Sequence, residues 1–265
     1  MYNKLQLALK YIHFFVTASD RRGHGVHSPF VFTFITEVLN DRRYFYAYER
    51  IEALRSRLLQ RSDKIEVLDY GAGSSVLKSN IRRVKDIAGW SLKSPKFGQL
   101  LFRIVHHYQP RRIIELGTSL GISSAYMAAA GSGAKVITLE GAPAIASIAI
   151  WQFNQLGLAN IELVEGSFDE TLPGVLEKAT TVDLGFVDGN HRKEPTLRYF
   201  GKLLPYLHSA SILILDDIHW SREMEEAWEE IKNQRCVTCS IDLFFMGIIL
   251  FNPDFKEKQH FKIRF

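Results

Sequence analysis

Hydrophobic positions along the chain form short apolar runs separated by longer segments with helical spacing. Five runs of four to six residues occupy positions 113–116, 136–139, 161–164, 182–187 and 211–215. Runs of this length and composition are typical of strands buried on both faces of a sheet. The segments between them are rich in helix formers, so strand and helix alternate. This alternation predicts an α/β protein with parallel strands.

Two further runs, at 237–244 and 247–251, lie close enough in the chain to form a hairpin. They bring the expected sheet to seven strands, mostly parallel, with an antiparallel hairpin at the C-terminal end and helices on both faces. The last segment, 255–265, is basic and aromatic, and we expect it to pack along an edge.

The N-terminal segment has an apolar periodicity of its own. Leu5, Leu9, Ile12 and Val16 recur at helical spacing, which favours an amphipathic helix over 2–17 rather than a signal peptide. Segments 30–39 and 42–60 predict two more helices. We therefore expect a helical cap or extension over residues 1–90 and the α/β domain over 91–265.

Charge is unevenly spread along the chain. Residues 1–111 carry 19 Lys and Arg against 9 Asp and Glu, whereas 112–265 carry 14 against 20. Such asymmetry suits a nucleic-acid surface or a basic segment folded onto an acidic domain, and we favour the second. The apolar runs are too short to cross a bilayer, so no membrane partner is expected. A single C-x-x-C without a disulfide framework points to the cytoplasm.

The stretch Arg112–Glu140 combines the features of a nucleotide-binding unit. A strand leads to Gly117, a tight turn runs to Gly121, a helix follows, and a second strand ends at Glu140. The start of a helix offers free N–H groups to an anion, and an acid about 20 residues past such a turn suits ribose hydroxyls.

The glycine spacing indicates which nucleotide this unit would bind. The turn reads Glu115-Leu-Gly-Thr-Ser-Leu-Gly121, which is not G-x-G-x-x-G. It resembles the first motif of the Rossmann-like methyltransferases that bind S-adenosylmethionine. The resemblance implies that the loop contacts the methionine part of the cofactor and that Glu140 binds the ribose. The cofactor residues implied here are Glu115, Gly117, Thr118, Ser119, Gly121, Ser123 and Glu140.

The segment before the first strand extends this resemblance. Gly98-Gln99 and Tyr108-Gln-Pro110 are similar to the approach to the cofactor in catechol O-methyltransferase. The resemblance implies that the loop Ser91–Ser94 holds the amino-acid end of the cofactor, with Lys93 and Ser94 as candidates. It also implies that Ser167 and Phe168, after the third strand, contact the adenine.

Three carboxylates follow the next two strands. Asp188 ends the fourth strand, and Asp216 and Asp217 end the fifth. Carboxyl ends of parallel strands meet at one edge of a sheet, where unpaired acids would repel one another. The oxygen ligands predict Mg²⁺ or another divalent cation at these three residues. The alternative is that they cap helices and pair with the basic segment.

His191 lies three residues after Asp188 and can act as a general base near neutral pH. Asp-x-x-His followed by Asp-Asp resembles the metal-dependent sugar O-methyltransferases of the macrocin type. That resemblance implies Mg²⁺ on the three acids, His191 as base, and Asp188 as a catalytic and cofactor-binding residue. The catechol and caffeoyl-CoA enzymes have Asp-Asn and a lysine instead, which argues against a catechol acceptor.

The leading hypothesis is an S-adenosylmethionine-dependent methyltransferase, Mg²⁺-assisted, that acts on a hydroxyl of a small molecule. Two alternatives stay open: a nucleic-acid methyltransferase that uses the basic N-terminal segment, and an inactive cofactor-binding partner protein. Strand four ends in Asp-Gly-Asn-His rather than an amino-methylation motif, so nucleic acid is not the expected partner. A homodimer is left open. The loop His24–His27 is expected near the acceptor. The segment Asp69–Gly73 resembles the first motif but is interpreted as a loop, because no second strand and no acid follow it at the right distance.

Overall fold

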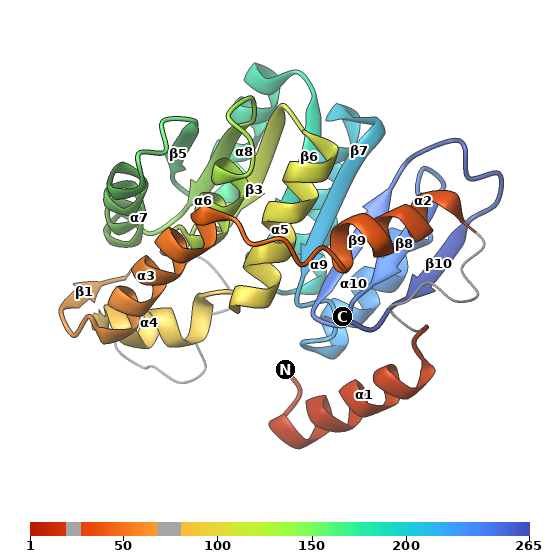
Figure 1. Ribbon diagram of the computed structural model, residues 1–265, viewed down its shortest axis with the longest axis horizontal. Helices are drawn as coiled ribbons and strands as arrows, with labels where there is room; N and C mark the ends of the chain where they lie inside the picture. The colour runs from red at the N-terminus through yellow and green to blue at the C-terminus, as the bar shows by residue number, and fades with distance from the viewer. Residues whose placement is uncertain (20–27, 68–80) are drawn as a thin grey trace. The chain divides into compact units, whose positions relative to one another are not determined.

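The structure is a computed structural model that describes residues 1–19, 28–67 and 81–265 (Figure 1). The loop His24–His27 and the motif Asp69–Gly73 lie outside the described residues. The chain forms two compact units, one of Asp41–Lys178 and one that combines Met1–Asn40 with Ala179–Phe265. The predicted division into 1–90 and 91–265 stays a prediction.

The 41–178 unit contains a set of helices around three parallel strands. The helices are α3 (Tyr46–Gln60), α4 (Val84–Ser91), α5 (Pro95–Tyr108), α6 (Ile122–Ala129), α7 (Pro143–Leu156) and α8 (Phe168–Ala179), the last ending just past the unit boundary. The parallel strands are β3 (Arg112–Leu116), β4 (Lys135–Glu140) and β5 (Ile161–Glu165), and a separate antiparallel pair is β1 (Lys64–Glu66) and β2 (Ile81–Arg83).

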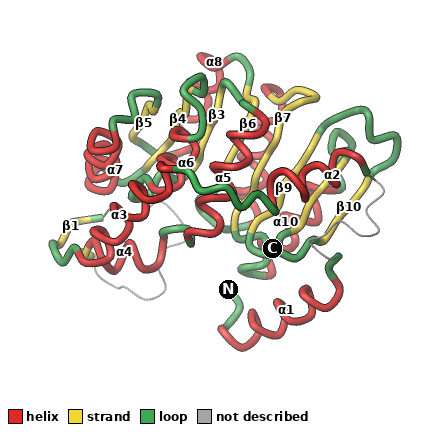
Figure 2. The backbone as a smooth tube through the Cα atoms, in the orientation of Figure 1, coloured by secondary structure: helices red, strands yellow, loops and turns green. Residues whose placement is uncertain are grey.

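The register within this unit aligns the carboxyl ends of neighbouring strands. Leu116, the last residue of β3, is opposite Leu139 on β4, and Glu140 is opposite Glu165 at the end of β5. The Ile113–Leu116 side chains are buried, as the apolar run predicted. The glycine turn and Glu140 therefore lie at the same edge of the three strands, which run side by side in Figure 2.

The unit that holds both termini has its own helices and strands. Its helices are α1 (Lys4–Thr17), α2 (Pro29–Thr33), the π-helical turn η1 (Phe34–Leu39), α9 (Lys193–Leu203), the 3₁₀ turn η2 (Leu204–Tyr206) and α10 (Arg222–Lys232). Its strands are β6 (Val182–Val187), β7 (Leu207–Asp216), β8 (Cys239–Asp242), β9 (Met246–Leu250) and β10 (Gln259–Lys262).

The strands of this unit are ordered β10-β8-β9-β7-β6. β6 and β7 are parallel, whereas β9 is antiparallel to both β7 and β8, so the predicted C-terminal hairpin is confirmed. β10 pairs in parallel with β8 and ends the row of strands. The basic C-terminal segment thus packs along an edge as predicted, and it adds a strand that the seven-strand prediction did not include.

The N-terminal helix is anchored on the C-terminal part of the chain. Phe14 of α1 and Ala18, which follows the helix, pack against Phe244, which follows β8. The chain just after α1 continues this contact, because Ser19 forms a β-bridge with Ile263. The predicted helix over 2–17 is confirmed as α1, and its neighbours come from the far end of the sequence.

The predicted fold class is confirmed: the protein is α/β, with mostly parallel strands flanked by helices. The short helix α4 and the helix α8 were not predicted, and α8 contains Pro173 and Gly174, which the sequence pattern favours in turns. Among the described residues, no helix is long and apolar enough to cross a membrane.

Candidate functional site

The glycine turn after β3 is tied to the end of β4 by backbone hydrogen bonds. The N–H groups of Gly117 and Thr118 both donate to the carbonyl of Leu139, each at 3.1 Å. Gly117 has φ 106°, a conformation that an L side chain rarely adopts. Gly121 is required by packing as well, since a Cβ there would lie 2.7 Å from the Phe153 ring. These contacts fix the shape of the turn.

Glu140 closes this turn from the end of β4. One carboxylate oxygen accepts the N–H of Ser119 and the other accepts the N–H of Ala142, both at 2.9 Å. Glu140 is half-buried, so the carboxylate is held in one orientation at the carboxyl edge of the strands. The Ser91 and Ser119 hydroxyls are hydrogen-bonded at 2.7 Å, which joins the end of α4 to the same turn.

Glu115 lies beneath the turn and is fully buried. Its carboxylate accepts hydrogen bonds from the hydroxyls of Ser123 at 2.5 Å and Thr138 at 2.7 Å, and a third from Ser124. Three hydroxyl donors compensate for taking a carboxylate out of water. The cofactor role predicted for Glu115 stays a prediction, and in the structure its carboxylate is hydrogen-bonded by side chains of the protein.

Ser124 and Thr138 are partners of this cluster that sequence reasoning missed. Thr138 also hydrogen-bonds Thr118 at 2.6 Å, which connects the buried cluster to the turn. A polar residue in the apolar run 136–139 was the available signal, because a buried hydroxyl needs a hydrogen-bond partner.

Four more of the predicted cofactor residues lie at the starts of two helices. Lys93 and Ser94 precede α5, and the Ser94 carbonyl accepts the N–H of Gly98 at 3.0 Å. Ser167 precedes α8 and Phe168 begins it. They are all in the unit that contains the glycine turn, and their contact with a cofactor stays a prediction.

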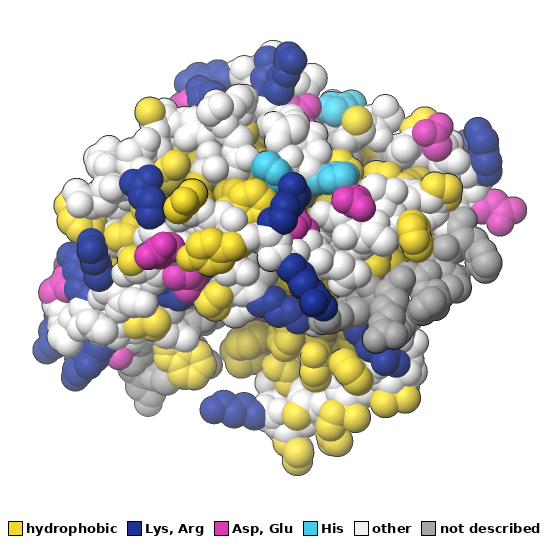
Figure 3. Space-filling model, viewed as in Figure 1, with side chains coloured by type: hydrophobic (Ala, Val, Ile, Leu, Met, Phe, Trp, Pro, Cys, Tyr) yellow, Lys and Arg dark blue, Asp and Glu magenta, His cyan; other side chains and the backbone are white. Residues whose placement is uncertain are grey.

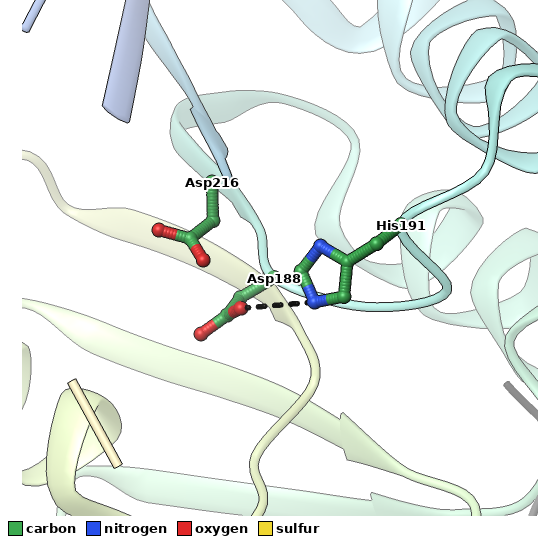
Figure 4. A group of neighbouring side chains, drawn as sticks. All are labelled: Asp188, His191 and Asp216. Carbon is green, nitrogen blue, oxygen red and sulfur yellow. Dashed lines mark ion pairs between the residues drawn. The ribbon is translucent and has the colours of Figure 1, made fainter. Parts of the chain in front are cut away.

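Two predicted metal ligands and the predicted base come together in the unit that holds the termini. One ligand atom each of Asp188, His191 and Asp216 lies within 4.8 Å of the others (Figure 4). His191 Nε2 is 3.7 Å from a carboxylate oxygen of Asp188. Asp216 is buried at 2% exposure, whereas the His191 side chain is 28% exposed.

The local backbone explains how these side chains meet. Asp188 follows β6 and Asp216 ends β7, and these two strands are parallel neighbours. The chain then turns sharply after Asp188, with positive φ of 68° at Asn190 and 22° at His191. That turn brings the imidazole back towards the strand ends, where Figure 4 shows it beside Asp188.

Asp217, the third predicted ligand, is not part of this group. Its backbone has φ 53° and its N–H donates to the Phe245 carbonyl at 2.7 Å. The donor set found in the described residues is therefore two carboxylates and one imidazole. Carboxylates suit hard cations such as Mg²⁺ or Mn²⁺, and a ligating imidazole would favour a transition metal.

A buried polar network lies next to Asp217 and was not predicted. His219 makes hydrogen bonds of 3.0 Å with Glu225 and 2.9 Å with Asp242. Burial lowers the pKa of His219, but hydrogen bonds with Asp242 and Glu225 outweigh it, so the net shift is upwards. Glu225 also binds Tyr2 and Lys10, which links α1 to the turn after β7.

Comparisons with known proteins agree with this description. Residues 114–218 match a family model described as a methyltransferase domain. A catechol O-methyltransferase of Mycobacterium tuberculosis is 29% identical over 127 residues, covering 47% of this chain and 56% of that enzyme. One of Niastella koreensis is 30% identical over 128 residues, covering 47% and 57%. The matched segment thus spans little more than half the length of these relatives.

Solved structures show the same fold. The SAH-bound Podospora anserina methyltransferase PaMTH1 superposes with a TM-score of 0.59 at 14% identity, over 95% of this chain and 97% of that one. The O-methyltransferase TomG of Streptomyces achromogenes, in complex with SAM, gives 0.56 at 20% identity, over 79% and 91%. Residues 114–218 are thus similar to a methyltransferase domain, the solved structures share the fold, and the predicted resemblance to the Rossmann-like O-methyltransferases is confirmed.

Proposed function

We propose that the protein is an S-adenosylmethionine-dependent O-methyltransferase that acts on a hydroxyl group of a small molecule. The observation that carries the proposal is the glycine turn with Glu140 hydrogen-bonded into it, inside a segment that matches a methyltransferase domain. Relatives named as catechol O-methyltransferases and a SAM-bound O-methyltransferase of similar fold support the same reaction class.

The residues of the 41–178 unit would bind the cofactor. Glu140 offers a carboxylate to the ribose hydroxyls, and Gly117 and Gly121 keep side chains away from the methionine part. Ser167 and Phe168 begin α8 and would contact the adenine, while Lys93 and Ser94 would hold the amino-acid end. These assignments follow the resemblance in the turn and its flanking segments.

The group in the other unit would handle the acceptor. Asp188 and Asp216 fit a divalent cation, since both offer carboxylate oxygens close to one another at adjacent strand ends, and Asp217 would join them if its side chain reached the ion. A bound cation would lower the pKa of the acceptor hydroxyl. His191 would then accept the proton at Nε2, which lies beside Asp188.

The bond changes in this reaction are few. The hydroxyl oxygen of the acceptor forms a bond to the methyl carbon, and the electron pair of the breaking carbon–sulfur bond returns to sulfur. The proton goes to His191, and S-adenosylhomocysteine and the methyl ether are the products. Asp188 next to the imidazole would stabilise the charge that His191 gains.

Binding of S-adenosylhomocysteine to the full-length protein tests the cofactor assignment without knowledge of the acceptor. Calorimetry should give a dissociation constant at least tenfold higher for Glu140→Ala, a loss of ~1.4 kcal/mol. Glu162→Ala is the matched control, because Glu162 is an exposed acid on β5. Absence of binding to the wild-type protein, or equal affinity of Glu140→Ala, would contradict the proposal.

A further inference from the structure

The helix α1 is apolar on two opposite faces, and only one of them is covered by described residues. Phe14 is buried on the inner face, and the neighbouring Tyr11 ring packs edge-on against Phe244 with centroids 5.0 Å apart. The outer face carries the α1 stripe, defined by four aliphatic residues with exposed fractions of 71, 59, 59 and 70%: Leu5, Leu9, Ile12 and Val16.

The stripe is continuous along the helix. Its members are separated by four, three and four residues, so they lie one above another on a single face. Figure 3 shows hydrophobic side chains gathered over α1. Single apolar residues are ordinary on protein surfaces, but a contiguous row of large ones marks a surface that binds a protein or a membrane. A helix that is apolar all round is expected to be buried.

Cationic side chains lie at both ends of α1. Lys4 is exposed at the first turn of α1. Lys262 is exposed on β10, and its backbone carbonyl accepts the N–H of Ser19 at 2.8 Å. The Arg264 guanidinium lies 4.7 Å from the centroid of the Phe15 ring, beside the last turn of the helix. Residues 1–19 contain no Asp or Glu. The α1 stripe and its rim thus combine apolar area with positive charge.

This charge decides between the two occupants of such a face. A second copy of the chain would bring these cations together, because residues 1–19 contain no acid and Glu225, the acid that contacts α1, is already paired with Lys10. An anionic lipid surface offers phosphates to the same cations and acyl chains to the aliphatic side chains. We propose that the α1 stripe docks on anionic lipid, with Lys4, Lys262 and Arg264 on the headgroups.

The contact is peripheral. The 14 residues of α1 are too few to span a bilayer, and the inner face of the helix is packed on its own unit. The helix therefore lies along the lipid surface with its outer face immersed. The sequence analysis expected no membrane partner because the apolar runs are too short to cross a bilayer, and that criterion does not detect a helix that lies on a lipid surface.

Vesicle sedimentation of the full-length protein tests the docking and is independent of methyl transfer. The probes are vesicles of phosphatidylcholine alone and of an equal mixture of phosphatidylcholine and phosphatidylglycerol. The protein should bind the mixed vesicles and lose affinity as salt rises, because exposed charges are screened. Binding to phosphatidylcholine alone should be weaker, since the cations then have no partner in the surface.

Two double variants separate the apolar and ionic contributions. Leu9→Gln with Ile12→Gln should lower affinity for the mixed vesicles roughly tenfold or more, because both side chains leave water on docking. Lys4→Gln with Lys262→Gln should lower it by a similar factor on mixed vesicles and leave phosphatidylcholine binding unchanged. Leu59→Gln is the matched control, since Leu59 is 45% exposed on a different helix.

The variants are expected to fold, because the substituted side chains point away from the protein, and circular dichroism and thermal melting check this. The proposal is overturned if the wild-type protein ignores the mixed vesicles or if the Leu9 and Ile12 variant binds them as tightly as the wild type. Self-association that this variant abolishes, without vesicle binding, would assign the stripe to a second copy instead.

Discussion

At the scale of single residues, Glu115 shows how a motif acid can stabilise the turn it precedes. Its buried carboxylate accepts hydroxyls from Ser123, Ser124 and Thr138. Glu115→Gln replaces one acceptor oxygen by a donor, so at least one hydroxyl loses its partner. We expect a loss of about 1–3 kcal/mol in the free energy of unfolding.

Urea unfolding measures this loss. Glu162→Gln serves as the control, because that side chain is exposed and its pair with Lys135 lies on the surface. If both variants unfold at the wild-type midpoint, the hydroxyl cluster does not stabilise the turn. The position of Glu115 before the first glycine was evident from the sequence, but its three hydroxyl partners come from other elements and were not.

The metal assignment is also a residue-scale prediction. Asp216 is the most buried member of the group with Asp188 and His191, so Asp216→Asn should raise the dissociation constant for Mn²⁺ at least tenfold, or ~1.4 kcal/mol. Electron paramagnetic resonance of free Mn²⁺ measures this without an acceptor.

His191 separates the two roles of an imidazole beside a metal. If His191 acts as the proton acceptor and not as a ligand, the His191→Gln variant should keep Mn²⁺ affinity within about threefold of the wild type. If His191 is a ligand, the His191→Gln variant should lose as much Mn²⁺ affinity as the Asp216→Asn variant. If chelator-treated protein retained full methyl transfer, the metal would not be needed for the reaction.

At the scale of elements, close packing of α5 on α6 depends on one glycine. A Cβ on Gly98 would lie 2.5 Å from the Tyr126 ring, whose hydroxyl donates to Glu52 at 2.6 Å. The ring is held from both sides and has little room to move. Gly98→Ala should therefore cost about 1–3 kcal/mol of stability.

Gly174→Ala is the matched variant, since Gly174 lies in α8 with no neighbour within 4 Å of the added Cβ. There the substitution should be neutral or stabilising by up to ~1 kcal/mol, because alanine is the better helix former. Thermal melts compare the two. Equal effects would mean that the ring of Tyr126 yields to the added methyl group.

The anchor of α1 should depend on pH in both directions. Burial raises the pKa of Glu225, but hydrogen bonds from Tyr2, Lys10 and His219 outweigh it and hold the pKa below its ordinary 4.5. Glu225 therefore stabilises the fold above pH 4.5 and loses this contribution as pH falls through its folded value. His219, whose pKa is raised, stabilises below its ordinary 6.5 and loses its contribution as pH rises.

The network should thus stabilise the protein most between pH 4.5 and 6.5. The difference in melting temperature between wild type and Glu225→Gln, followed across pH, should be largest in this window. A difference that does not change with pH would show that packing of Phe14, rather than the ionic network, holds the helix.

The elements themselves were largely predictable. Apolar runs gave β3 to β9 within one or two residues at most ends, because strands buried on both faces leave a continuous hydrophobic signal. The extension of β7 back to Leu207 was missed, because its first four residues are not fully buried and the polar residues His208 and Ser209 interrupt the apolar run. β10 was missed as a strand because Phe261 is the one apolar residue of Gln259–Lys262, so the sequence shows no apolar run there.

Some site residues were likewise predictable from the sequence and others were not. Strand-end residues such as Glu140, Asp188 and Asp216 follow from topology, which a sequence pattern can predict. The exclusion of Asp217 from the compact donor group depends on a φ of 53° in a single turn. No local pattern predicts that conformation, because the Asp217 N–H donates to the carbonyl of Phe245, which lies far along the chain in the turn between β8 and β9.

At the scale of the whole molecule, one compact unit is built from both ends of the chain. The Ser19 N–H donates to Lys262, the Arg264 N–H donates to Ser19, and Phe14 packs on Phe244. We expect contacts this distant in sequence to form late in folding, because closing a long loop costs entropy before the contacts form. The predicted cap over residues 1–90 stays a prediction, and α1 is the part of it whose packing on the C-terminal segment is described.

Deletion of residues 1–19 should therefore weaken the C-terminal strands selectively. The deletion exposes Phe244 and removes Tyr2 and Lys10, two partners of Glu225, together with the bridge from Ser19 to Ile263. Amide hydrogens of β8 and β10 should therefore exchange faster. The amides of β4 and β5 belong to the 41–178 unit, which the deletion does not touch, and they should keep their protection. Hydrogen exchange followed by mass spectrometry compares these peptides in one sample. Equal acceleration in β4 and β10 would mean that the two units unfold as one, and unchanged exchange in β10 would mean that α1 contributes no stability to the strand beside it.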